Sequence, residues 1–289
     1  PRGKMKNRSL SILMIVNLHK DSSGILMGVI AERLKILGHR VEYFAFEGKP
    51  DQMVAEGPWD IVFVLGGDGT VLYTARSLAA LGLPILPINL GTLGFIANVH
   101  KDEWETVFMR WISGSCPVSE RMMLEVRLER EGRSLGPWMA LNDAVVSSTG
   151  ISKIIRLTVG TETVSFGNYR SDGLIIATPT GSTAYSVAAG GPILDPEMQA
   201  FIVNPICPFT LSNRPLVIPG DEAVHIDLEK GQRSDILLTL DGQEVVPLEE
   251  GDRVLVRKAV IPARIVESNR FAFYTALRSK LNWSGGPGA

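Results

Sequence analysis

One stretch of the sequence combines glycines, a hydroxyl and a carboxylate in a way that suits phosphate chemistry. Residues 59–75, WDIVFVLGGDGTVLYTA, place a run of five apolar residues directly before the turn GGDGT at 66–70. Glycines leave the backbone accessible to a ligand, and a helix N-terminus favours anions. We expect Thr70 to cap the helix that follows. A carboxylate at Asp68 would repel phosphate, which indicates that it handles a proton, a sugar hydroxyl or a metal.

A second stretch, residues 169–194, reads YRSDGLIIATPTGSTAYSVAAGGPIL. An apolar run at 174–177 predicts a buried strand, and the loop TPTGST at 178–183 leads into a short helix of small residues at about 183–189. Hydroxyl side chains and backbone N–H groups converge in such a loop, and alanines let a planar ring or a sugar approach. Arg170 and Asp172 precede the loop, either facing a ligand or forming a structural ion pair.

The elements around these loops predict two domains. Apolar runs at 11–17, 41–46, 59–65 and 84–89 alternate with helical spacing, as at 24–37, and this indicates βαβ units in a doubly wound parallel sheet. In such sheets ligands bind at the carboxyl ends of the strands, where GGDGT and the motif NLGTLGF at 89–95 would lie. We therefore predict an α/β domain over residues 1–115 that carries GGDGT.

Short β-branched or alternating runs separated by turn residues dominate the rest of the chain. They predict an antiparallel β-sandwich over residues 116–268. Helical spacing returns at 271–281, so residues 269–289 are expected to form a helix that packs on the first domain, followed by a disordered tail. The predicted strands of the β-rich part are 124–129, 144–147, 154–159, 174–178, 223–228, 236–240, 253–256 and 263–266.

Composition excludes several classes of partner. The 289 residues carry a formal net charge of -2 with no basic block, so neither nucleic acid nor an anionic membrane surface is indicated. Two cysteines without CxxC spacing fit a reducing compartment. No stretch approaches 18 uninterrupted apolar residues, and the opening residues PRGKMKNRS lack the apolar core expected of a signal peptide. We expect a cytoplasmic protein that binds small molecules. The absence of GxxxxGK[ST] excludes a P-loop.

Seven motifs together carry a family resemblance. They are GGDGT, NLGTLGF, ERMMLEV at 120–126, Asn142-Asp143, DGLIIATPTGSTAYSVAAGGPIL from 172, PFTLSNRPLVIP at 208–219 and the final KLNW. From about residue 11 to 283 the chain resembles the NAD kinase family. GGDGT is shared with diacylglycerol-type lipid kinases, sphingosine kinases and, nearly, phosphofructokinases, whereas TPTGSTAY is far more specific.

The resemblance implies phosphoryl transfer from ATP, or in some members polyphosphate, to the adenosine 2′-hydroxyl of NAD, giving NADP. It implies Mg²⁺ or another divalent cation and a homodimer or homotetramer. Asp68 would be the catalytic base, and the N–H groups of Gly66, Gly67, Gly69 and Thr70 would meet the donor phosphates. The implied NAD-binding positions are Asp68, Gly69, Phe95, Asn142, Asp143, Lys153, Arg170, Asp172, Thr183, Ala184, Tyr185, Ala188 and Gln243. Mg²⁺ keeps most of its waters, so its ligands are unassigned.

Two departures and two alternatives accompany this prediction. Asp143 stands where the family usually has glutamate, and Ala188 stands where many relatives have serine. A lipid or other small-hydroxyl kinase would share GGDGT but would need a broad apolar acceptor cleft. A non-catalytic dinucleotide-binding protein would have little use for a carboxylate at Asp68. The choice of donor, the acceptance of NADH and feedback by product stay open.

Overall fold

The computed structural model describes residues 8–19, 23–48, 50, 57–91, 94–150, 154–210, 213–232, 234–267 and 270–281. The chain divides into two compact units. The first comprises residues 1–121 and 263–289, and the second comprises residues 122–262. Among the predicted features, Lys153 and the tail at 282–289 lie outside the described residues.

A mainly parallel sheet forms the centre of the first unit. Its strand order is β2 (Arg40–Phe46), β1 (Ser11–Asn17), β3 (Ile61–Gly66), β4 (Pro84–Asn89), β19 (Ala263–Val266) and β6 (Val118–Arg121), and β5 (Val99–His100) also pairs with β4. The strands from β2 to β19 run parallel, and β6 is antiparallel to β19. Every residue of β3 and β4 is buried, as expected for parallel strands covered on both faces.

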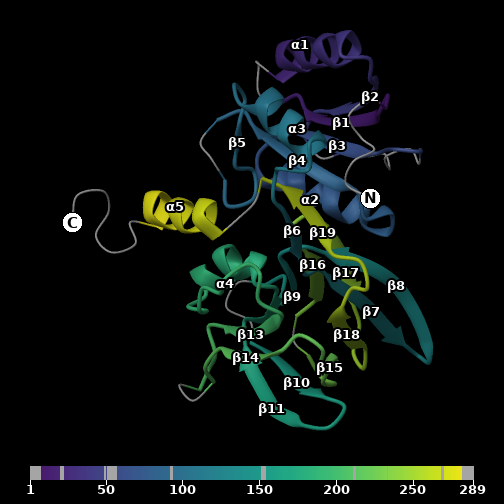
Figure 1. Cartoon of the computed structure of the whole chain (residues 1–289). Helices are drawn as coiled ribbons and strands as arrows, with labels where there is room; N and C mark the ends of the chain where they lie inside the picture. The colour runs from purple at the N-terminus through teal and green to yellow at the C-terminus, as the bar shows by residue number, and fades with distance from the viewer. Residues whose placement is uncertain are drawn as a thin grey trace. The chain divides into compact units, whose positions relative to one another are not determined.

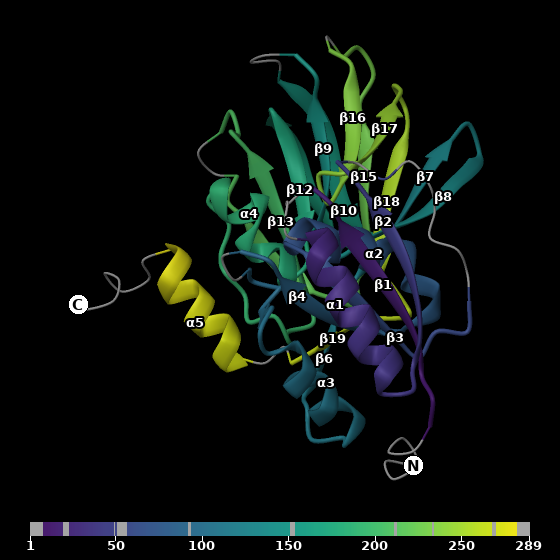
Figure 2. The same cartoon turned by 90° about the horizontal axis from the view of Figure 1, so that it is seen from above.

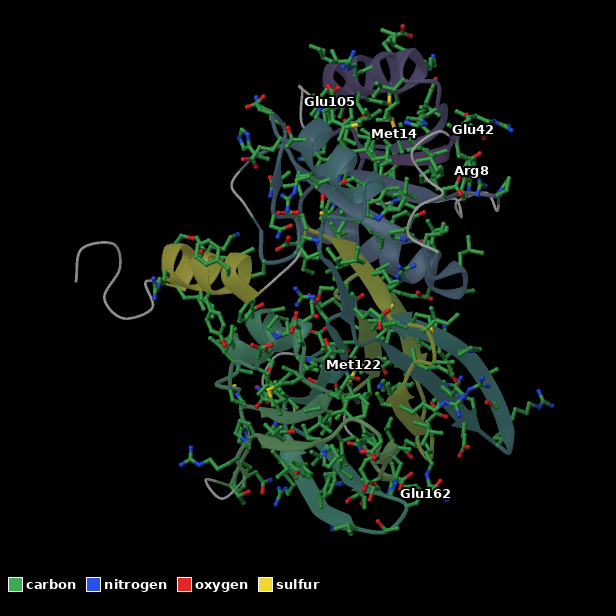
Figure 3. All side chains as sticks on the ribbon, viewed as in Figure 1. Arg8, Met14, Glu42, Glu105, Met122 and Glu162 are labelled. Carbon is green, nitrogen blue, oxygen red and sulfur yellow. The ribbon has the colours of Figure 1, made fainter. Side chains whose placement is uncertain are left out.

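Helices cover both faces of this sheet. Figures 1 and 2 show α1 (Ser23–Ile36) lying over β1, and Figure 1 shows α2 (Asp68–Ser77) on the opposite side. Residues of α1 and α3 (Trp104–Ile112) share one core with alternate residues of the strands, including the buried Met14 (Figure 3). On the surface, Arg33 of α1 pairs with Glu105 of α3 at 2.6 Å. This doubly wound arrangement confirms the predicted fold class.

Strand β19 corrects one assignment. The sequence grouped residues 263–266 with the β-rich part, but in the structure they extend the sheet of the first unit, where Arg264 pairs with Pro84. A four-residue apolar run predicts a strand but carries no information about its partner. Just beyond it, α5 (Arg270–Leu281) belongs to the same unit, and the buried Phe273 lies 6.2 Å from the ring of Phe95. The predicted return of the C-terminal helix to the first domain is confirmed.

The second unit is an antiparallel β-sandwich. One sheet has the order β11 (Ser165–Ser171), β10 (Ile155–Thr161), β15 (Val224–Leu228), β18 (Arg253–Lys258), β7 (Leu124–Arg130) and β8 (Arg133–Ala140). The other has the order β14 (Leu216–Pro219), β13 (Ala200–Ile206), β12 (Gly173–Ala177), β9 (Asp143–Ser148), β16 (Ile236–Leu240) and β17 (Glu244–Leu248). Inward-facing residues of both sheets form one core with Met122 (Figure 3).

Three short helical segments complete the described elements. They are 3₁₀ turns at Ala79–Leu81 and Thr180–Thr183 and the helix α4 (Tyr185–Ala188). Residues on the outer face of β12 and β13 form a smaller core with Leu194, and Ala189, which directly follows α4, packs against it. Within the described residues, every helix is too short or too polar to cross a membrane.

Candidate functional site

The turn GGDGT connects β3 to α2 in the first unit. Gly67 is the N-cap of α2 without any side-chain cap, and the N–H of Thr70 donates to the carbonyl of Gly67 at 3.0 Å. The expected cap by Thr70 is therefore wrong, because this residue lies inside the first helical turn. Its side chain packs against Gly66, where an added Cβ would lie 2.8 Å from the Cβ of Thr70. Gly66 is thus required by close packing.

The carboxylate of Asp68 accepts three consecutive backbone N–H groups. Oδ2 accepts from Phe95 at 3.0 Å, and Oδ1 accepts from Ile96 at 3.1 Å and Ala97 at 2.8 Å. An ionised carboxylate offers about four acceptor positions, so among the described residues one position on Oδ2 has no donor assigned to it. Asp68 is half-buried, and the three bonds fix the direction of its oxygens.

Phe95 itself lies between this carboxylate and the C-terminal helix. Besides its contact with Phe273, its ring lies 5.6 Å from Nζ of Lys280. The backbone N–H of Phe95 thus contacts the carboxylate of Asp68. Both residues are among those predicted to bind the dinucleotide.

A pocket of about 300 Å³ lies in the second unit. It brings together four of the predicted residues, Asn142, Asp143, Ala184 and Tyr185, from two segments that are separated by some forty positions in the sequence. Its other lining residues are Val145, Ser147, Thr239, Asp241 and Gly242.

Two sets of hydrogen bonds build this pocket. Asp241, buried and in a left-handed conformation with φ of 50°, accepts the N–H groups of Leu141, Asn142 and Asp143 at 2.7–3.1 Å. The hydroxyl of Thr178 donates to the carbonyl of Leu141 at 2.6 Å and accepts the N–H of Gly181 at 3.0 Å. These hydrogen bonds therefore hold together the segments at 141–143, 178–185 and 239–242.

Electrostatics distinguish Asp143 from an ordinary surface carboxylate. Its side chain is only 4% exposed, and burial, together with repulsion from the nearby Asp241, raises the pKa of Asp143 to about 7. Beside it, Oδ1 of Asn142 is buried and accepts no hydrogen bond from the described residues. The pocket therefore offers an amide oxygen and a carboxyl group that is partly protonated at neutral pH.

The other predicted residues lie around or outside this pocket. The hydroxyl of Thr183 is 3.3 Å from the carbonyl of Thr180, Ala188 is exposed on α4, and Gln243 directly follows Gly242 of the pocket wall. The expected helix over 183–189 is divided into the 3₁₀ turn and α4.

Arg170 and Asp172 do not line the pocket. The guanidinium of Arg170 lies 5.0 Å from the ring centroid of Phe209, and no ion pair joins Arg170 to Asp172 in the part of the chain that the structure describes. Asp241, which lines the pocket, was not among the residues predicted from the sequence. An acidic residue before glycine in the sequence TLDGQ was the available signal.

The described residues contain no cluster of three or more histidine, cysteine, aspartate or glutamate side chains that could hold a metal. Mg²⁺ typically binds through one or two carboxylates, substrate phosphates and water. The single carboxylate of the turn GGDGT is compatible with that mode of binding.

Comparison with known proteins gives a consistent picture across the chain. A family model described as the ATP-NAD kinase N-terminal domain matches residues 13–115, and one described as the ATP-NAD kinase C-terminal domain matches residues 141–268. An NAD kinase of Treponema denticola is 40% identical over 274 residues, covering 95% of this chain and 96% of that protein. An NAD kinase of Desulforamulus reducens is 38% identical over 267 residues, with coverage of 91% and 92%.

Two solved structures have the same fold. A yeast NADH kinase complexed with NADH superposes with a TM-score of 0.84 at 25% identity, covering 97% of this chain and 90% of that one. An NAD kinase from Archaeoglobus fulgidus in complex with ATP superposes with a TM-score of 0.74 at 25% identity, with coverage of 92% and 96%.

Proposed function

The chain belongs to the NAD kinase family, and we propose that it transfers a phosphoryl group from ATP to the adenosine 2′-hydroxyl of NAD with Asp68 as general base. The observation that supports this role is the orientation of the Asp68 carboxylate by three backbone N–H groups. Among the described residues, one acceptor position on Oδ2 has no donor assigned to it, and the substrate hydroxyl would occupy it. Asp68 is also only partly buried, as a residue that meets a substrate must be.

Asp68 would orient the attacking hydroxyl and accept its proton late in the reaction. Phosphoryl transfer passes through a loose transition state, so positioning and neutralisation of charge matter more than early deprotonation. General-base assistance of this kind typically contributes on the order of 10²–10⁴-fold in rate. The fixed orientation of Oδ2 supports this role because it removes the need to reorganise the base at each turnover.

The turn GGDGT is proposed to receive the donor phosphates. The N-terminus of α2 and the glycines at 66, 67 and 69 suit an anion, whereas the N–H of Thr70 already donates to the carbonyl of Gly67. A bound divalent cation would offset the charge of the donor phosphates. The cation would lie near Asp68, and its protein ligands stay unassigned.

The pocket of the second unit is proposed to bind one end of NAD. A volume of about 300 Å³ is at the lower limit for ligand pockets, which suits one base or ring rather than a whole dinucleotide. The buried Oδ1 of Asn142 would accept a hydrogen bond from the ligand, and the exposed face of Tyr185 would pack against a ring. The expected homodimer or homotetramer and the cytoplasmic location stay predictions.

The variant Asp68→Asn tests the proposal. One amide oxygen can replace Oδ1 and keep the bonds from Ile96 and Ala97, so we expect the variant to fold and to bind NAD. With NAD, ATP and Mg²⁺, its kcat for NADP formation should fall by about 10²–10⁴-fold. The matched control is Asp102→Asn, which alters an exposed carboxylate of the same unit and should leave kcat unchanged.

Two outcomes would contradict the proposal. Near-normal turnover in Asp68→Asn would remove the role as base. If the unmodified enzyme formed no NADP but phosphorylated a lipid such as diacylglycerol, the acceptor would be wrong.

A further inference from the structure

We propose that Asn89 and Gly94 are positioning residues for the reaction, which act by holding the backbone segment 95–97 that orients the carboxylate of Asp68. The inference rests on the proposed role of Asp68. Neither residue is expected to contact the substrate. Both belong to the motif NLGTLGF, but the sequence analysis assigned a role only to Phe95 of this motif.

Asn89 organises the loop after β4 from a buried position. It is the last residue of β4 and is only 2% exposed. Its Oδ1 accepts the N–H of Gly91 at 2.7 Å, and its Nδ2 donates to the carbonyl of Ala97 at 2.9 Å. One side chain thus connects both ends of the loop that returns to Asp68.

Gly94 closes the same loop and leaves room for the carboxylate. Its N–H donates to the carbonyl of Ala97 at 2.8 Å, so that carbonyl accepts from both Asn89 and Gly94. A Cβ at position 94 would overlap Oδ1 of Asp68 and lie 2.5 Å from its Cγ. Gly94 does not adopt a positive φ, so the requirement for glycine is steric rather than conformational.

These contacts connect the two residues to the chemistry. The carbonyl of Ala97 is held by Asn89 and Gly94, while the N–H of Ala97 and those of the two preceding residues point at Asp68. A displacement of this segment would turn Oδ2 away from its orientation. Errors of about 1 Å in the position of a catalytic group can cost roughly 10²-fold in rate.

The first test is a double-mutant cycle between Gly94→Ala and Asp68→Ala, read by Tm. In the unmodified protein the added methyl group meets the carboxylate, so Gly94→Ala should lower Tm. In the Asp68→Ala background the overlap is absent, and the same substitution should leave Tm almost unchanged. If Asp68→Ala does not fold, Asp68→Ser takes its place, because a serine hydroxyl is smaller and still accepts one N–H. Equal losses of Tm in both backgrounds would overturn the inference.

The second test is kinetic. Gly94→Ala and Asn89→Leu should each lower kcat by about 10–10²-fold with little change in the KM values for NAD and ATP. The matched control is Gly28→Ala, which adds a methyl group on an open face of α1 and should leave kcat unchanged. A rise in KM with unchanged kcat, or full activity in both variants, would contradict a positioning role.

The two tests separate this inference from the proposed function. If the cycle shows coupling but Asp68→Asn retains normal turnover, the segment holds Asp68 and the role of Asp68 as base is wrong. If Asp68→Asn loses turnover but the cycle shows no coupling, the role as base stands and the positioning role of Gly94 is wrong.

Discussion

Asp241 accepts the backbone N–H of Asp143 at 3.1 Å, so the residue that holds Asp143 in place also places a negative charge next to its carboxyl group. Asp241 accepts the N–H groups of Leu141, Asn142 and Asp143, and these hydrogen bonds favour its charged form. Asp143 is buried beside it, and the pKa of Asp143 rises to about 7. Asp241 therefore helps to build the pocket and, in addition to burial, raises the pKa of Asp143.

Stability should depend on pH through Asp143. The pKa of an aspartate in the unfolded chain is about 3.8 and that of folded Asp143 is about 7, so between these values the folded state binds a proton that the unfolded state has lost. The free energy of unfolding should therefore decrease as pH rises from 4 to 7 and level off above 7.

The variant Asp143→Asn checks this prediction because an amide cannot ionise. Its stability relative to the unmodified protein should increase with pH over this window, by on the order of 4 kcal/mol at most. Urea denaturation at pH 4, 5, 6, 7 and 8 measures the difference. Glu162→Gln, on the exposed turn after β10 (Figure 3), is the control and should show no such trend. A pH-independent difference for Asp143→Asn would contradict the prediction.

Removing the carboxylate of Asp241 should loosen the pocket and weaken the pH effect, because burial, the larger cause of the raised pKa of Asp143, remains. Asp241→Ala leaves three N–H groups without their acceptor, and each unsatisfied buried group costs about 1–3 kcal/mol. We expect a lower Tm, weaker binding of NAD by calorimetry and a pKa of Asp143 closer to its ordinary value. Unchanged affinity for NAD would show that the segment 141–143 does not form the binding site.

A methyl group at Gly181 should disrupt the same pocket from the other side. An added Cβ would overlap the carbonyl oxygen of Asn142 and lie 2.5 Å from its carbonyl carbon. Backbone atoms cannot turn aside as a side chain can, so Gly181→Ala should lose about 1–3 kcal/mol of stability and bind NAD more weakly. Denaturation and calorimetry on Gly181→Ala, with Gly28→Ala as control, measure both. Wild-type affinity in Gly181→Ala would contradict this prediction.

The ring of Tyr185 should matter more than its hydroxyl. Tyr185 is 48% exposed at the pocket, and stacking of a base on an aromatic ring is worth about 1–3 kcal/mol. Tyr185→Ala should raise the KM for NAD by roughly ten- to a hundredfold, whereas Tyr185→Phe should change it little. Equal losses in both variants would instead assign binding to the hydroxyl.

The two cysteines should differ in reactivity. Burial raises the pKa of Cys116 to about 12, together with the neighbouring Glu267, whose carboxylate accepts a hydrogen bond from the thiol at 2.8 Å. The side chain of Cys207, in contrast, is exposed. At pH 7.5 a thiol reagent should modify one group per chain rapidly. Cys207→Ser should remove that reaction, and Cys116 should react only after unfolding. Rapid modification in Cys207→Ser would contradict this assignment.

Local patterns were sufficient for much of the fold. The apolar runs at 11–17 and 84–89 became β1 and β4 with the predicted bounds, because strands that are buried on both faces must be apolar throughout. The strand at 263–266 was also found, but its assignment to the β-rich part was wrong. Its pairing with β4 joins positions 180 residues apart in the sequence, and no local pattern encodes such a partner.

The candidate site divides in the same way. The glycine turn and Asp68 were predicted from residue types and spacing, and Asn142, Asp143, Ala184 and Tyr185 were predicted from the family resemblance. Asp241, Asn89 and Gly94 were missed because their roles lie in what they touch. The hydrogen bonds between Asp241 and the segment 141–143 join residues about 100 positions apart in the sequence. Those between Asp68 and the segment 95–97 join residues 27–29 positions apart.

The sequence by itself determined the family, the strands and helices of most of the chain, and the residues with reactive groups. Only the tertiary structure decided how those groups are held. Three amides direct the carboxylate of Asp68, and burial together with the charge of Asp241 raises the pKa of Asp143. The physical reason is that hydrogen-bond direction, desolvation and charge repulsion act over a few ångströms in space. They depend on which distant segments meet, and residue type and spacing do not specify that.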